Sequence, residues 1–248
     1  MVSQEDHYKN PLVSIPQKKL EHAIRIVIDS FPEDKGKDVS DGLSQDCYVL
    51  IDAINRYAVA NIPVDYWFRD MSNFKGDKGL LNSYTKVTSN IAKAYNQGTR
   101  LCFAGNHGVG KTMTSACILK KAVETGYSGL YVTLTDIVTL MASHDVDGKH
   151  IARQSLLKTD FLVIDEFDPR FMGTDNASDL YGRILEPTLR TRIQNTLPVF
   201  LCTNSPNVLA SFSGSIRQSI TSLMGLVHMV PVLGNDYRSV IAAETKNG

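Results

Sequence analysis

Cysteine is scarce in this sequence of 248 residues, and its arrangement excludes a disulfide-stabilised scaffold. The four cysteines are scattered along the chain and none forms a C-x-x-C pair: Cys47, Cys102, Cys117 and Cys202. No small-domain framework of bridges can be read from this spacing. We therefore expect reduced, buried thiols, which are typical of a cytosolic protein.

An excess of charge and a long hydrophobic run are also absent. Lys and Arg total 26, as do Asp and Glu, so nucleic-acid binding would have to depend on a local patch. The longest nearly apolar run, residues 223–233, is too short to span a bilayer. The N-terminus is polar and does not resemble a secretion signal. We expect a cytoplasmic protein without a membrane segment.

The composition that is present suits a folded domain. Hydrophobic residues make up 43% of the chain and charged residues 21%, which is enough for one α/β domain with a short appendage. Residues 17–31 have the apolar spacing of an amphipathic helix, which either packs on its own domain or docks a partner. The charged stretch 32–38 indicates a linker. We therefore predict a helical docking region and linker at 1–45 and the main domain at 46–248.

Helices and apolar runs then alternate along the chain. Helices are expected at 46–60 and 79–95, and from residue 99 short apolar runs alternate with helical patterns. The predicted strands are 101–104, 130–134, 161–164, 198–204 and 226–230. Helices are predicted at 111–124, from 135, and at 150–157, 180–195 and 215–224, with a break or kink at Pro187. This alternation is typical of a mostly parallel sheet with flanking helices.

One motif in this pattern carries specific chemistry. The stretch from Gly105 to Thr112 reads Gly-Asn-His-Gly-Val-Gly-Lys-Thr, which fits G-x-x-x-x-G-K-[ST] between a strand and a helix. Backbone N–H groups of such a loop cradle phosphates, while Lys111 reaches the β- and γ-phosphates and Thr112 reaches Mg²⁺. The strand before it and the helix after it are the context that the motif requires. The sequence therefore predicts a nucleotide site here.

Polar residues at two other strand ends extend the predicted site. Asp165 and Glu166 follow the strand at 161–164, where α/β sheets bind ligands, so Asp165 can serve Mg²⁺ and Glu166 can deprotonate a water. Asp168 is expected to be a turn or surface acid. Asn204 ends the strand at 198–204; it is either a turn residue or a partner of the γ-phosphate or attacking water.

Together, the glycine loop, Asp165-Glu166 and Asn204 resemble Walker A, Walker B and sensor 1 of an AAA+ ATPase. Over about residues 60–240 the sequence is similar to the DnaC and DnaI helicase loaders and to the related IstB transposition ATPases. The similarity also includes Asn61-Ile62-Pro63 and the late Asp236-Tyr237-Arg238. The fold that this resemblance implies is an AAA+ domain without a helical lid.

The resemblance also implies roles for individual residues. Glu166 would be the catalytic base, Asn204 sensor 1, and Arg238 a sensor-2-like arginine. Loaders place an arginine finger where this chain has Ser222-Leu223-Met224; the nearest arginine, Arg217, is either that finger or a surface residue. The expected ATP contacts are Gly105, Asn106, His107, Gly108, Val109, Gly110, Lys111, Thr112 and Met113, with Thr112 and Asp165 serving Mg²⁺.

The function implied is an ATP-dependent loader that assembles on single-stranded DNA through shared ATP sites and delivers a replicative ring helicase. Lys149, His150 and Arg153 are the expected DNA contacts, or else a solvated charged face. The alternative is an IstB-like accessory ATPase that acts on duplex DNA with a transposase. A nucleotide-dependent switch with little turnover is a third possibility, and the presence of Glu166 argues against it.

Overall fold

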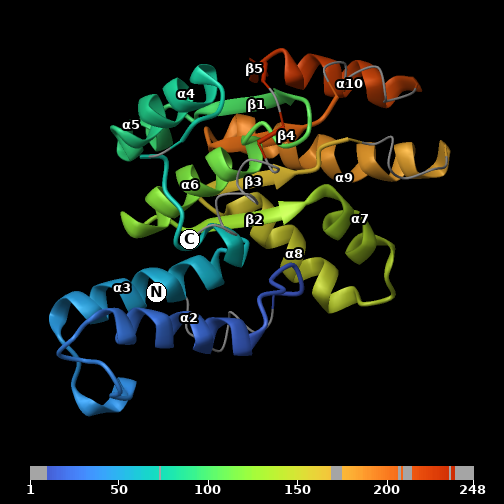
Figure 1. Ribbon diagram of the computed structural model, residues 1–248. Coiled ribbons are helices and arrows are strands. Elements are labelled where there is room, and N and C mark those ends of the chain that lie inside the picture. The colour runs from blue at the N-terminus through green and yellow to red at the C-terminus, as the bar shows by residue number, and fades with distance from the viewer. Residues whose placement is uncertain are drawn as a thin grey trace.

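A parallel β-sheet forms the centre of the molecule (Figure 1). The computed structural model describes residues 10–72, 74–168, 175–205, 208, 214–234 and 236–237. Within them the strand order is β2-β3-β4-β1-β5, and every neighbouring pair is parallel. The strands are β1 Arg100–Gly105, β2 Gly129–Thr133, β3 Phe161–Asp165, β4 Val199–Thr203 and β5 His228–Val232. The predicted mostly parallel sheet is confirmed.

Helices cover both faces of this sheet. Their bounds are α2 Gln17–Ser30, α3 Gln45–Val59, α4 Lys78–Thr88, α5 Ile91–Asn96, α6 Lys111–Glu124, α7 Leu134–Ala142, α8 Val146–Lys158, α9 Asp175–Gln194 and α10 Gly214–Met224. Because side chains alternate along a strand, Tyr131 and Val163 face a core shared with α2 to α6. Leu130, Val132 and Leu162 face the opposite core, with α7 to α10. Because all five strands are parallel, their carboxyl ends lie at one edge of the sheet, which is where α/β proteins bind ligands.

The N-terminal helices are part of the same packed body. Helix α2 packs on α3, and α3 packs on α6. Buried residues of α2, Ala23, Val27 and Ile28, belong to the core cluster that also includes Phe103 of β1. The apolar spacing of residues 17–31 is therefore explained by packing within the chain, which was one of the two predicted possibilities.

The stretch 32–38, predicted as a linker, is a structured loop between α2 and α3. Asp34 is 1% exposed, and its carboxylate accepts hydrogen bonds from the backbone N–H of Ser44 at 2.9 Å and from Nζ of Lys37 at 3.0 Å. The Ser44 hydroxyl also donates to it, and these hydrogen bonds lower the pKa of Asp34 to about 2. The charge pattern indicated a linker, whereas one of its acids is buried and hydrogen-bonded.

The structure corrects one sequence expectation about helices and narrows another. The helix predicted at 79–95 is divided into α4 and α5, because Asn90 leaves the helical conformation and its side chain accepts a hydrogen bond from the N–H of Lys93. Pro187 lies inside the single helix α9 and does not end it. In the described part of the chain, no helix is both long and apolar enough to cross a membrane.

Candidate nucleotide site

The predicted phosphate loop connects β1 to α6. Gly108 and Gly110 have φ angles of +73° and +100°, in the left-handed region that favours glycine. A Cβ on Gly110 would lie 2.7 Å from the ring of Phe74, and one on Gly108 would lie 1.8 Å from an Asp236 oxygen. The backbone N–H of Tyr237 also donates to the Gly108 carbonyl at 3.1 Å. Residues on both sides thus contact the loop, and its glycines allow Phe74 and Asp236 to approach the loop backbone closely.

Lys111 begins α6 and joins the loop to the end of β4. Its Nζ donates to the carbonyls of Gly105 and Asn106, at 2.8 and 2.5 Å, and to Oδ1 of Asn204 at 2.8 Å. Lys111 is only 6% exposed. Since β1 and β4 are neighbours in the sheet, their carboxyl ends bring Asn204 to the lysine. This ammonium group can reach a phosphate placed in the loop.

Asp165 ends β3 and holds the second half of the site. The Thr112 hydroxyl donates to its Oδ2 at 2.8 Å, and the backbone N–H of Glu166 donates to its Oδ1 at 2.7 Å. Oδ2 also accepts a 2.5 Å hydrogen bond from the hydroxyl of Tyr131, a buried residue on β2. Burial and the nearby carboxylate raise the pKa of Tyr131, so the phenol is a neutral donor.

Tyr131 is the member of this cluster that the sequence did not predict. It stands in an ordinary strand pattern, and no motif marks it. Its position two residues before the end of β2, with β2 next to β3, is the only signal that could have placed it near Asp165.

Glu166 lies beside this cluster with its side chain exposed. Its φ of +52° is unusual for a residue with a Cβ. Partial burial, then the charges of Asp165 and Asp136, raise the pKa of its carboxyl group. An exposed carboxylate next to Asp165 can accept a proton from a water molecule. Asp168, expected to be a turn or surface acid, lies just after β3 and is 1% exposed, so it is not at the surface.

The oxygen ligands present fit a magnesium–nucleotide complex. Mg²⁺ prefers carboxylate, hydroxyl and water oxygens and is usually held by one or two protein ligands together with phosphates. The Thr112 hydroxyl and the Asp165 carboxylate lie within 2.8 Å of each other at the start of α6. Among the described residues, no three His, Cys, Asp or Glu side chains are grouped to bind a metal by themselves.

The other predicted site residues lie apart from this cluster or outside the description. Arg238 and the side chain of Arg217 are outside the described part of the chain, although the backbone of Arg217 belongs to α10. Lys149, His150 and Arg153 lie on α8, and the last two are exposed. Their predicted contacts with DNA or with a second subunit stay predictions.

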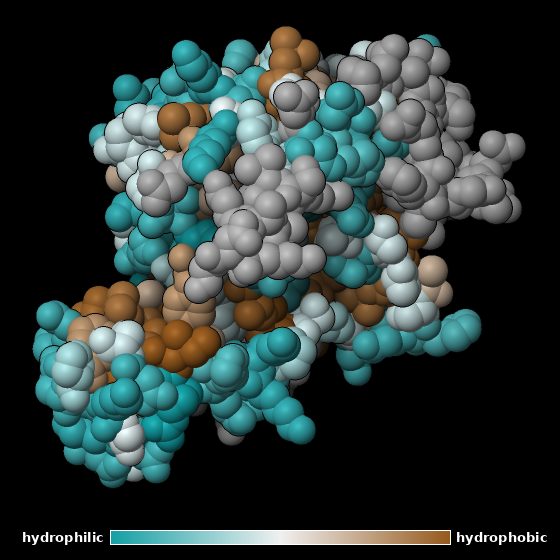
Figure 2. All heavy atoms as spheres, viewed as in Figure 1, coloured by the Kyte–Doolittle hydropathy of each residue, from teal (hydrophilic) through white to brown (hydrophobic). Residues whose placement is uncertain are grey.

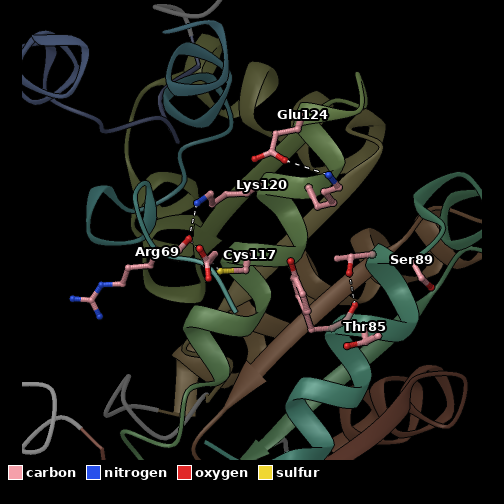
Figure 3. Close-up of a pocket in the computed structure, with 10 residues that line it drawn as sticks. Arg69, Thr85, Ser89, Cys117, Lys120 and Glu124 are labelled. Atoms are coloured by element: carbon pink, nitrogen blue, oxygen red, sulfur yellow. Dashed lines mark hydrogen bonds and ion pairs between the residues drawn. The ribbon is translucent and has the colours of Figure 1, made fainter. Parts of the chain in front are cut away.

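A separate cavity of about 330 Å³ lies between α4 and α6 (Figure 3). Lys120, on its wall, is buried and donates to the carbonyls of Tyr66, Trp67 and Arg69, at 3.1, 2.7 and 2.7 Å. These bonds attach the segment before α4 to the side of α6. The same segment continues to Phe74, which packs against the phosphate loop.

Comparison with known proteins agrees with this geometry. Residues 83–193 match the family of IstB-like ATP binding proteins. A search of curated proteins found no match. A crystal structure of DnaI is similar with a TM-score of 0.58 and 18% identity, over 71% of this chain and 94% of that chain.

Two further solved structures have the same fold. A structure of the DnaC helicase loader is similar with a TM-score of 0.51 and 18% identity, over 68% of this chain and 99% of that chain. AMPPCP-bound DnaA from Aquifex aeolicus is similar with a TM-score of 0.55 and 20% identity, over 75% of this chain but only 56% of that one. Residues 83–193 thus resemble IstB-like ATP binding proteins, and the chain has the fold of the solved DnaI, DnaC and DnaA structures; with the phosphate loop, this likeness supports an ATPase.

Proposed function

We propose that this ATPase is a helicase loader, which assembles on single-stranded DNA and delivers a replicative ring helicase. The observation that favours this function is the extent of the likeness: the chain covers 94% of the DnaI structure and 99% of the structure of the DnaC helicase loader. Almost the whole of each of those two chains therefore has a counterpart in this one. The DnaA structure, by contrast, is covered over just more than half its length.

The roles proposed for the site follow from its contacts. Lys111 would exchange its three oxygen acceptors for phosphate oxygens when ATP enters the loop. Thr112 and Asp165 would hold Mg²⁺, which supplies charge neutralisation at the phosphates when bound. Glu166 would take the proton of the attacking water, and Asn204 would sense the γ-phosphate from the position where it now contacts Lys111.

Self-association would complete the site. We propose that Arg217 of one subunit reaches the ATP of the next, where an arginine in trans is worth about 10³-fold or more in rate. Mixing Arg217→Ala with Lys111→Ala chains should then restore part of the activity that each lacks alone. Failure to restore it at any ratio would refute a finger at Arg217. Arg238 would contact the nucleotide from its own subunit.

The N-terminal helices offer a surface for the helicase. Apolar side chains are exposed on the outer sides of α2 and α3: Ile26 at 43%, Tyr48 at 37%, Val49 at 56% and Leu50 at 45%. Figure 2 shows apolar atoms gathered over this part of the molecule. Because the buried side of α2 already packs on α3, we propose that the partner meets this exposed surface, which extends from the predicted docking region at 1–45 onto α3.

The test is capture of the partner in the presence of ATP. Tagged Glu166→Gln protein, which should retain ATP, is incubated with host lysate and with labelled DNA, and Lys111→Ala serves as the control that cannot hold ATP. Recovery of a replicative helicase, with preference for single-stranded DNA, supports the loader. Recovery of a transposase, with preference for duplex DNA, supports the alternative that the IstB-like match suggests.

A further inference from the structure

Tyr131 reaches the Walker B aspartate from the neighbouring strand. In the parallel register of β2 and β3, Tyr131 lies opposite Val163, and Thr133 lies opposite Asp165. Tyr131 and Asp165 are thus on the same face of the sheet, offset by two residues, or about 6–7 Å. The length of the phenol ring covers this offset, and its hydroxyl donates to Oδ2 of Asp165 at 2.5 Å.

This donor completes the orientation of the carboxylate. Oδ1 accepts from the N–H of Glu166, and Oδ2 accepts from both Thr112 and Tyr131. The Glu166 contact comes from the next residue and the Thr112 contact from a hydroxyl that metal binding would recruit. Tyr131 is therefore the side-chain donor that can hold Asp165 in place independently of the nucleotide.

The backbone of Tyr131 is fixed as firmly as its ring. Its N–H donates to the carbonyl of Ala60 at 2.8 Å, and its carbonyl accepts from Nδ2 of Asn61 at 2.9 Å. Asn61 also donates to the carbonyl of Leu12 at 2.9 Å and accepts from the N–H of Ser14 at 3.0 Å. The outer edge of β2 is thus held by the segment that follows α3.

We propose that Tyr131 is a positioning residue for the metal site: its hydroxyl keeps the Asp165 carboxylate turned toward the Thr112 hydroxyl, ready to receive Mg²⁺. This inference rests on the proposed function, in which Thr112 and Asp165 serve the metal. Loss of a partner that orients a metal-binding carboxylate typically weakens metal affinity by about 10–100-fold. Tyr131→Phe keeps the ring in its core position and removes only the donor.

The experiment measures Mn²⁺ binding, so that it does not depend on ATP hydrolysis. Each protein, mixed with one equivalent of ADP, is titrated with Mn²⁺, and free Mn²⁺ is measured by electron paramagnetic resonance. Thermal unfolding checks that each variant is folded. Tyr131→Phe should weaken Mn²⁺ binding about tenfold. Tyr57→Phe is the matched control, since it removes an equally buried tyrosine hydroxyl that donates to a carboxylate, Glu124, away from the loop.

Two further variants separate this inference from the proposed function. If Asp165→Asn leaves Mn²⁺ affinity unchanged, the proposed metal site itself is wrong. If Asp165→Asn weakens binding but Tyr131→Phe does not, the metal site stands and the positioning role is overturned. In the double variant, Tyr131→Phe should add no further loss to that of Asp165→Asn, because it acts through that carboxylate; additive losses would also overturn the role.

Discussion

Replacing Glu166 with glycine should stabilise the fold while it strongly slows ATP hydrolysis. Glu166 has a φ of +52°, and a Cβ in the left-handed region costs about 1–2 kcal/mol. Glycine removes this cost but loses about 0.5–1 kcal/mol through the greater freedom of the unfolded chain. The backbone N–H that donates to Asp165 remains. The expected net gain is therefore about 1 kcal/mol, or about 2–4 °C in Tm for a protein of this size.

Hydrolysis should change in the opposite direction. If Glu166 is the general base, its removal lowers kcat by about 10²–10⁴-fold, which corresponds to about 3–5 kcal/mol in the activation barrier. No described residue donates a hydrogen bond to the Glu166 carboxylate. Glu166→Gln should therefore show the same loss of kcat with little change in Tm.

The assays are thermal unfolding, binding of a fluorescent ATP analogue and steady-state release of phosphate. Thr196→Gly is the matched control, because Thr196 has a φ of +55° in the turn before β4, away from the loop. It should gain similar stability and keep full activity. A Tm that falls in Glu166→Gly would refute the strain argument, and a kcat within twofold of the wild type would refute the catalytic role.

Three other substitutions test how the structure is held. Asn61→Gly keeps the positive φ and removes three side-chain hydrogen bonds. At about 1 kcal/mol per bond, urea unfolding should show that the free energy of unfolding falls by about 2–3 kcal/mol. A fall of less than about 0.5 kcal/mol would contradict this expectation. The Arg192 guanidinium, fully buried, donates to three backbone carbonyls; Arg192→Lys cannot span them and should cost about 2–4 kcal/mol, and an unchanged unfolding midpoint would count against this. Because the pKa of Asp34 is lowered to about 2, its stabilisation is present above its unfolded pKa and is lost as pH falls from about 4 toward 2. Asp34→Asn should therefore flatten the fall in stability between about pH 4 and 2, and an equal slope in both proteins would contradict that.

The parts of the site that sequence could predict are those encoded by contiguous residues. The glycine loop fixes its own geometry, and α6 begins at Lys111 as expected because the motif defines where the helix starts. Asp165 and Asn204 could be placed at the same edge of the sheet, because all strands of a parallel sheet end on one side. Predicting the glycine loop and the start of α6 requires only the local sequence pattern. Placing Asp165 and Asn204 requires only the knowledge that the sheet is parallel.

The parts that sequence could not predict depend on which distant residues meet. Asp34 stands in a charged stretch typical of solvent-exposed loops, and its burial depends on Ser44 across the α2–α3 connection. Asn90 was one polar residue in a helical pattern, and only its cap on α5 shows where the helix breaks. Tyr131 carries no motif, because its role depends on the register between β2 and β3.

Helix α6 physically connects the phosphate loop to the N-terminal helices. It has 14 residues, so it extends about 21 Å from Lys111. At its far end, the Val123 carbonyl accepts from Arg56 at 3.0 Å, and Glu124 accepts from the hydroxyl of Tyr57. Both donors lie on α3. The phosphate loop and α3 are therefore joined by one continuous helix and two side-chain hydrogen bonds, and α3 carries much of the apolar surface proposed to meet the helicase.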